Sequence, residues 1–235
     1  MSEEAAAFLR ARRRPLELVI FDCDGVLIDS EALSNRVAAV MLADAGWEIT
    51  EAEAEHRFIG LSFGAVQEIA EVYLGRSLGA DWVTRVVTRL VDVMRREVEP
   101  VPGAREALDA VAGLGLPWRI ASNSSHFEME AKFGRTGWQE LVAGRVHSAA
   151  DLVKRGGAAK PAPDVFLAAA SAEAVVPAHC LVIEDSVAGV TAARAAGMDC
   201  LGLARHGDGA ALRSAGAVLF RSMHDIPDLL RAAVE

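Results

Sequence analysis

The short apolar segment Leu16–Phe21 is the feature that most restricts what this chain can fold into. Its leucine, valine and isoleucine residues show no helical periodicity, which is typical of a buried strand. Asp22, Cys23, Asp24 and Gly25 follow directly, and the glycine permits a sharp turn. A strand without polar alternation is typical of a parallel sheet that helices cover on both faces.

Apolar segments of the same kind alternate with helical patterns in the second half of the chain. This alternation favours an α/β fold whose core is a Rossmann-like, doubly wound parallel sheet. The expected strands cover Trp118–Ser122, Cys180–Ile183, Cys200–Leu203 and, with a weaker pattern, Ala217–Phe220. The expected helices cover Ala104–Gly113, Glu128–Phe133, a segment after Pro163 and Asp164, Val187–Ala196 and Ile226–Val234.

Residues 32–100 interrupt this alternation with a purely helical pattern. We expect one helix from Glu31 to about Gly46, further helices over Glu51–Phe58, Phe63–Leu74 and Asp81–Val98, and no strand between residues 32 and 100. The alternation resumes after Pro100. The sequence therefore predicts two domains, an α/β catalytic core formed by residues 1–31 and 101–235 and an inserted helical cap domain formed by residues 32–100.

The charge balance argues against a nucleic-acid partner. The formal net charge is −9 and the sequence pI is about 5.2. One basic cluster is present, formed by Arg10, Arg12, Arg13 and Arg14. Such a run is usually a solvated tail, and a nucleic-acid-binding domain normally carries a more extensive basic face.

Membrane and disulfide-rich classes are also disfavoured. No apolar run reaches the roughly 18–20 residues of a membrane span. In a secretory signal the basic residues precede the apolar stretch, whereas the N-terminal arginines of this chain follow it. The three cysteines form no close pair, and the six histidines form no pair with metal-binding spacing. We expect a cytoplasmic protein without a membrane partner, and we take a monomer as the default state.

Polar side chains stand at the ends of the expected strands. Ligands of open α/β sheets bind beyond the carboxyl ends of the strands, so these side chains should lie together. Since side chains alternate along a strand, Asp22 and Asp24 should point one way and Cys23 the other. Several carboxylates at one edge favour a bound cation, and oxygen ligands suit Mg²⁺ better than zinc. The candidate site residues at strand ends are Asp22, Asp24, Ser122, Asn123, Glu184 and Asp185, and a glycine-rich loop adds Lys160.

Four segments in this order resemble the motifs of the haloacid dehalogenase superfamily. They are Phe21–Glu31, Ile120–Ser124, Lys160–Asp164 and Ile183–Gly189. The most similar subgroup contains sugar-phosphate phosphatases and beta-phosphoglucomutase-like proteins. The helical insertion resembles the cap domain of that family.

The resemblance implies a phosphomonoester hydrolase that works through an aspartyl-phosphate. Asp22 would attack phosphorus, and Asp24 would protonate the leaving alkoxide and then accept a proton from water. Ser122 and Lys160 would bind the phosphoryl oxygens, and Asn123 would add a donor. The implied substrate is a small phosphorylated metabolite, either a sugar phosphate or a phosphorylated sugar acid.

The resemblance also implies a Mg²⁺ cofactor and a moving cap. The ligands would be the Asp22 carboxylate, the Asp24 backbone carbonyl and the Asp185 carboxylate, with Glu184 acting through water or from outside the ligand set. Gly60 of the cap would face the active site and hinge its closure.

Other chemistries of the superfamily fit the sequence less well. A dehalogenase does not need the acid Asp24, and a phosphonatase needs a cap lysine, whereas residues 32–100 contain none. A beta-phosphoglucomutase-like mutase is the alternative that we keep open, although relatives of that type carry histidine and arginine where this chain has Ser34 and Phe63. A non-catalytic sensor is disfavoured because such proteins usually lose the nucleophile or the metal carboxylates.

Overall fold

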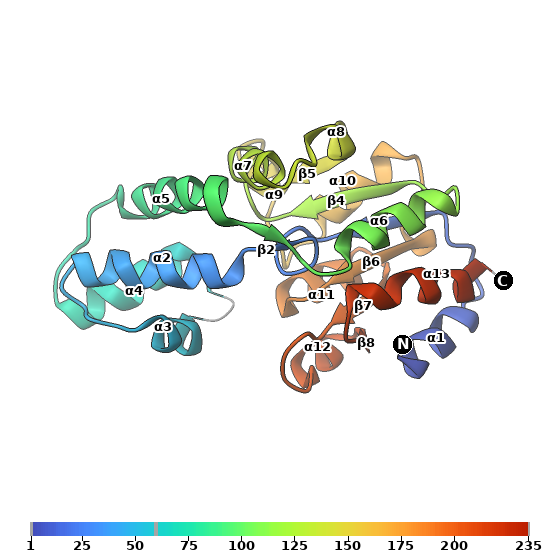
Figure 1. The fold of residues 1–235 in the computed structure, drawn as a ribbon, viewed down its shortest axis with the longest axis horizontal. Coiled ribbons are helices and arrows are strands. Elements are labelled where there is room, and N and C mark those ends of the chain that lie inside the picture. The colour runs from blue at the N-terminus through green and yellow to red at the C-terminus, as the bar shows by residue number, and fades with distance from the viewer. Residues whose placement is uncertain (1, 59–60, 235) are drawn as a thin grey trace.

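A parallel sheet forms the centre of the molecule (Figure 1). The computed structural model describes residues 2–58 and 61–234, and within them six strands pair in the order β5-β4-β1-β6-β7-β8. Phe21 of β1 lies opposite Ile120 of β4 and Ile183 of β6, so the carboxyl ends of these three strands share one edge. The strands are β1 (Leu18–Phe21), β4 (Trp118–Ser122), β5 (Val146–Ser148), β6 (Cys180–Glu184), β7 (Asp199–Leu203) and β8 (Val218–Phe220).

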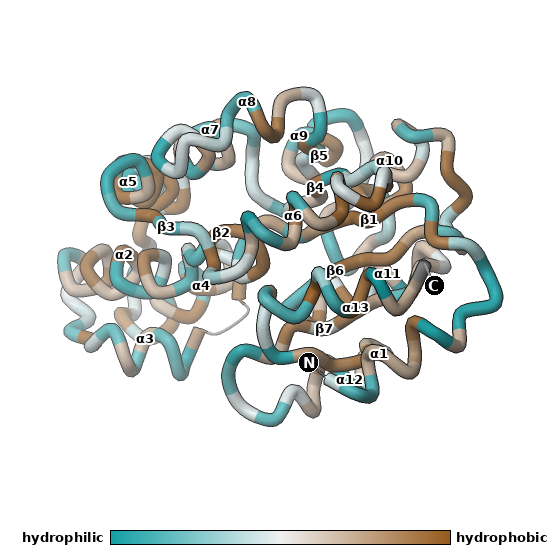
Figure 2. Tube along the Cα trace, turned by 45° about the vertical axis from the view of Figure 1, so that its right-hand side comes forward, coloured by the Kyte–Doolittle hydropathy of each residue, from teal (hydrophilic) through white to brown (hydrophobic). Residues whose placement is uncertain are grey.

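Helices cover both faces of this sheet, as the unbroken apolar strands predicted. Val19 and Phe21 belong to one buried apolar layer, whereas Leu18 and Ile20 belong to a second. The traces of β1 and β6 are hydrophobic, and helices surround them (Figure 2). The first layer includes α1 (Glu3–Arg10), α6 (Ala104–Gly113) and α13 (Ile226–Val234), and the second includes α10 (Asp164–Ala172), α11 (Val187–Ala195) and α12 (Ala210–Ala215).

In the sequence, four helices separate the two short strands β2 (Ile28–Asp29) and β3 (Glu99–Pro100). These helices lie to one side of the sheet (Figure 1). β2 and β3 pair antiparallel, with Asp29 opposite Glu99. Their buried apolar side chains, including Trp82 and Leu90, belong to the same apolar cluster as Val19 and Phe21 of β1. They are α2 (Glu31–Asp44), α3 (Glu51–Phe58), α4 (Phe63–Leu74) and α5 (Trp82–Glu97). The helical character of this segment is confirmed, and its division from the core as a cap domain stays a prediction.

Some elements differ from the sequence expectations. The prediction of no strand between residues 32 and 100 was wrong, since β3 begins at Glu99, but two residues cannot form a recognisable strand pattern. The expectation of a solvated arginine tail was wrong for Arg12, whose largely buried side chain pairs with Asp199 of β7. The N-terminal helix α1 and the edge strand β5 were not expected. The remaining elements are α7 (His126–Thr136), α8 (Gln139–Val142), α9 (Ala149–Val153) and single 3₁₀ turns at Pro177–His179 and Met223–Asp225.

No helix among the described residues combines the length and the apolar character needed to cross a membrane.

Candidate active site

The carboxyl edge of the sheet opens into a cavity of about 540 Å³ that the helices α2, α4 and α5 line from the opposite side. Asp22 follows β1, and its backbone N–H donates to the Ile183 carbonyl of β6 at 2.9 Å. Ser122 ends β4, and Glu184 ends β6. The sheet register therefore brings Asp22, Ser122 and Glu184, which are far apart in the sequence, to one side of the cavity, which we call its floor.

Lys160 lies at the centre of this floor. Its Nζ donates to Glu184 Oε1 at 2.8 Å, to the Ala121 carbonyl at 2.8 Å and to the Asp22 carboxylate. Burial alone would lower the pKa of Lys160, but the carboxylates of Asp22 and Glu184 outweigh it and raise the pKa above its ordinary value. The lysine is therefore a fixed positive charge beside Asp22.

Three carboxylates form a cluster around one position. Ligand oxygens of Asp22, Glu184 and Asp185 lie within 4.8 Å of one another. Burial raises the pKa of Asp22 to about 7, and burial together with the neighbouring carboxylates raises the pKa of Asp185 well above its ordinary value. One ammonium does not balance three carboxylates, and an all-oxygen donor set of this kind fits a hard divalent cation.

Glycines allow the cluster to be this compact. Gly25 has φ +75°, and a Cβ there would lie 1.7 Å from Asp185 Oδ2. A Cβ at Gly189 would lie 1.6 Å from Glu184 Oε1. Glu184 Oε2 accepts from the backbone N–H groups of Asp185 and Ser186, each at 2.8 Å, so this carboxylate is held in place.

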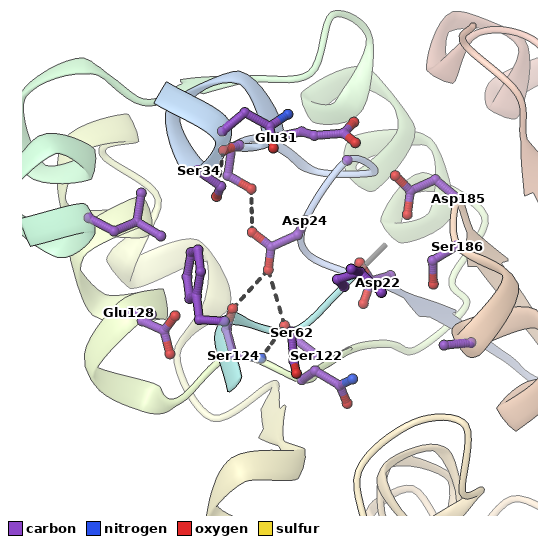
Figure 3. Close-up of a pocket in the computed structure, with 18 of the residues that line it drawn as sticks. Asp22, Asp24, Glu31, Ser34, Ser62, Ser122, Ser124, Glu128, Asp185 and Ser186 are labelled. Atoms are coloured by element: carbon purple, nitrogen blue, oxygen red, sulfur yellow. Dashed lines mark hydrogen bonds between the residues drawn. The ribbon is translucent and has the colours of Figure 1, made fainter. Parts of the chain in front are cut away.

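Asp24 lies apart from the three-carboxylate cluster and has its own set of donors (Figure 3). Lys132 Nζ donates to Asp24 Oδ1 at 2.6 Å, and the Ser30 hydroxyl donates to the same oxygen. The Ser124 hydroxyl donates to Asp24 Oδ2 at 2.9 Å, and Ser122 Oγ lies 3.4 Å from that oxygen. Burial would raise the pKa of Asp24, but Lys132 and the hydroxyl donors outweigh it and lower the pKa. Asp24 is therefore held as a carboxylate.

The structure places the remaining predicted residues as follows. Asn123 lines the cavity, and its side chain brackets the backbone of Lys160, accepting from the N–H at 3.0 Å and donating to the carbonyl at 3.4 Å. Ser122 is buried, and its hydroxyl also accepts from the Ser124 N–H at 3.0 Å. Cys23 is buried away from the cavity, as strand alternation predicted. Gly60 lies outside the described residues.

Sequence reasoning missed two members of this site, Lys132 and Ser124. Lys132 Nζ also donates to Ser124 Oγ at 2.8 Å, so the two residues hold Asp24 together. A signal for Lys132 was present, because the lysine stands between Ala131 and Phe133 on the buried face of α7. A lysine that a helix buries needs an acidic partner.

Comparisons with known proteins show which family this chain resembles. A family model described as "Hydrolase: haloacid dehalogenase-like hydrolase" matches residues 16–197. The 6-phosphogluconate phosphatase of Escherichia coli K12 is 30% identical over 188 residues, which cover 78% of this chain and 80% of that protein. Hexitol phosphatase A of the same organism is 32% identical over 183 residues, covering 76% of this chain and 78% of that protein.

Two further matches, one to a solved structure and one to a longer protein, differ in how much of the other protein they cover. A crystal structure of a HAD family hydrolase from Deinococcus radiodurans R1, with bound phosphate and sodium, superposes with a TM-score of 0.76 and 31% identity, covering 94% of this chain and 97% of the other. The chloroplastic protein SUPPRESSOR OF QUENCHING 1 of Arabidopsis thaliana is 32% identical over 213 residues. The match covers 86% of this chain but only 19% of that longer protein.

Proposed function

This chain belongs to the haloacid dehalogenase-like hydrolase family, and we propose that it is a Mg²⁺-dependent phosphatase of small phosphorylated sugars. The observation that carries the proposal is the separation of the carboxylates into two groups. Asp22 stands beside the fixed charge of Lys160 in the three-carboxylate cluster, whereas Asp24 lies outside that cluster and pairs with Lys132. Two carboxylates in different surroundings suit two different roles in one reaction.

Asp22 is the nucleophile in this proposal. A carboxylate oxygen of Asp22 bonds to phosphorus while the ester P–O bond breaks, and the departing alkoxide takes a proton from Asp24. Water then attacks the phosphorus of the aspartyl-phosphate, Asp24 takes the proton of that water, and phosphate and the free Asp22 carboxylate are restored. The lowered pKa of Asp24 favours the carboxylate form that the second step needs, and the negative charge of a bound phosphate favours the protonated form needed in the first.

The cation would be held by Asp22 and Asp185, with the Asp24 backbone carbonyl as the third protein ligand that the family resemblance implies. Both Glu184 oxygens already accept hydrogen bonds from Lys160 or from backbone N–H groups, so Glu184 suits a contact through water. Bound Mg²⁺ would neutralise the charge between the substrate phosphate and the Asp22 carboxylate.

Lys160 and Ser122 would bind the phosphoryl oxygens once substrate enters. Asn123 would act mainly by fixing the backbone of Lys160, with its remaining amide hydrogen as a further donor. Helices α2–α5 would close over the cavity as a cap and exclude water from the substrate. Gly60 retains its proposed part in that closure.

A phosphosugar mutase is the competing proposal, and two lining residues weigh against it. A mutase must hold its phosphorylated intermediate and return the phosphoryl group to the sugar. Ser34 and Phe63 both line the cavity, at the positions where mutase-like relatives carry a histidine and an arginine. A hydroxyl and a phenyl ring lack the positive charge needed to bind a phosphorylated intermediate tightly.

The test is phosphate release from a panel of sugar phosphates, with Mg²⁺ and with a chelator. The proposal predicts release that needs Mg²⁺ and that Asp185→Asn abolishes. Conversion of one sugar-phosphate isomer into another without net release would favour the mutase. Release that is unaffected by the chelator would contradict the proposed cation.

A further inference from the structure

The charges around the cavity are strongly unequal. Its described lining includes two cationic side chains, Lys132 and Lys160, and no arginine or histidine. Residues 59 and 60, outside the described part, are isoleucine and glycine and add no charge. The acidic lining residues are Asp22, Asp24, Glu31, Glu128, Glu184 and Asp185.

Neither ammonium is free for the distal part of a substrate. Lys160 is bound to Asp22 and Glu184 at the floor, where a phosphate would sit. Lys132 is bound to Asp24 and Ser124 and its side chain is only 1% exposed. The guanidinium of Arg205 does not line the cavity and is bound to both oxygens of Asp29, at 3.2 and 2.9 Å.

Two carboxylates lie beyond the reacting groups. Glu31 is exposed in the first turn of α2, and Glu128 is half-buried in the first turn of α7. Figure 3 shows both at the cavity, with Asp24 between them in that view. Ser125 fixes Glu128, because Glu128 Oε2 accepts from the Ser125 N–H at 2.9 Å and from its hydroxyl at 2.7 Å. Glu128 therefore cannot turn away from an approaching anion without losing its capping interaction.

The rest of the distal lining is neutral. Ser34, Asn35 and Ser62 offer hydroxyl and amide groups, and Phe63 and Leu90 offer apolar contact. Such groups bind hydroxyls well, but they cannot neutralise a second negative charge on the substrate.

We propose that this cavity selects phosphate monoesters whose leaving group is an uncharged polyhydroxy alcohol, and that Glu31 and Glu128 reject leaving groups carrying a carboxylate or a second phosphate. The inference rests on the proposed phosphatase function and narrows its substrate class. It separates this chain from a sugar-acid phosphatase, although a relative of about the same length bears the name 6-phosphogluconate phosphatase.

Sorbitol 6-phosphate and 6-phosphogluconate test the proposal directly. They share their carbon chain and phosphate position and differ at one end, which is CH₂OH in one and a carboxylate in the other. We expect kcat/KM to favour sorbitol 6-phosphate by about 10- to 100-fold, which is comparable with the discrimination that a pocket achieves over one methylene. Equal values, or a preference for 6-phosphogluconate, would overturn the inference.

Charge-neutral variants identify the residues responsible. Glu128→Gln retains an N3 side chain able to cap α7, and Glu31→Gln changes an exposed position, so both should fold. Each should reduce the preference several-fold by improving turnover of the carboxylate substrate. Glu130→Gln removes the same charge from an exposed position of α7 outside this cavity and should leave the ratio unchanged. If neither Glu128→Gln nor Glu31→Gln changed the ratio of the kcat/KM values for the two substrates, the assignment of Glu31 and Glu128 would be overturned.

Hydrolysis of 4-nitrophenyl phosphate, whose leaving group carries no carboxylate, distinguishes a failure of the proposed selectivity from a failure of the proposed phosphatase function. Turnover of this ester together with equal use of both sugar substrates would overturn the selectivity alone. No Mg²⁺-dependent turnover of any of the three esters would overturn the proposed function and the selectivity with it.

Discussion

Lys132 Nζ lies 2.6 Å from Asp24 Oδ1, which joins the middle of α7 to the turn after β1 across 108 residues of sequence. The same ammonium holds the Ser124 hydroxyl, which donates to the other oxygen of Asp24. The Ser30 hydroxyl also donates to Asp24, so groups from three separate segments orient this carboxylate. A carboxylate fixed in this way can meet a proton donor or acceptor without first reorganising.

Lys132→Met tests the strength of this arrangement. It leaves Asp24 without its ammonium partner, and removing one member of a buried ion pair typically costs about 3–5 kcal/mol. Because the Asp24 side chain is 36% exposed, we expect a loss of unfolding free energy near or below the lower end of that range. Urea denaturation measures it. Lys154→Met, which breaks an exposed pair with Asp151, should cost less than about 1 kcal/mol, and equal losses would contradict the account.

Gly189→Ala tests the close packing under Glu184. The new Cβ would lie 1.6 Å from Glu184 Oε1, and Glu184 is fully buried and held by Lys160, so it cannot move freely. We expect a destabilisation of about 1–3 kcal/mol, together with reduced phosphatase activity. Gly134→Ala is the matched control in α7, where the nearest atom would be 3.5 Å away. This change should stabilise the protein by up to about 1 kcal/mol, and a stable, active Gly189→Ala would rule out the tight packing.

Cation binding should be visible in thermal unfolding without any substrate. Mg²⁺ at 100 times its dissociation constant should add about 2.7 kcal/mol to the unfolding free energy. Asp185→Asn should abolish this response, because it removes a proposed ligand. The cation-free variant should be at least as stable as the wild type, since neighbouring carboxylates no longer repel a charge at that position. A cation-free variant much less stable than the wild type would contradict this account of the cluster.

The three cysteines should be unreactive in the folded protein. Burial raises the pKa of Cys23 well above its ordinary value and that of Cys180 to about 12, and it also raises the pKa of Cys200. The thiolate is the reactive form, so a thiol reagent at pH 8 should titrate none of them in the native state and all three after denaturation. A thiol that reacts rapidly in the native protein would show that its burial is incomplete.

The parts of the fold with local signals were predictable. Helices α3 and α4 have the bounds that their periodicity predicted, Glu51–Phe58 and Phe63–Leu74. The central strands were visible because they are buried on both faces and therefore apolar throughout. The start of α7 had a readable signal that was overlooked, since Ser125 and Glu128 form a capping box.

The missed features depend on contacts between distant segments. Strand β5 has three residues at an edge of the sheet, and its Val146 and His147 are only half-buried, so no periodicity marks it. The partner of Lys132 could not be read locally, because Asp24 precedes it by 108 residues. Most of the predicted site residues were identified at strand ends and Lys160 in a loop, whereas Lys132 reaches the site from the body of a helix.

The most direct test of the central claim is the mass of the peptide containing Asp22 after acid quench of Asp24→Asn during reaction with 4-nitrophenyl phosphate and Mg²⁺. The nitrophenolate leaves without a proton, so the first step should proceed, and the second should stall without the Asp24 base. We predict one phosphoryl group per chain on that peptide, and none in Asp22→Asn. Accumulation at another residue, or none while the wild type turns the ester over, would contradict Asp22 as the nucleophile.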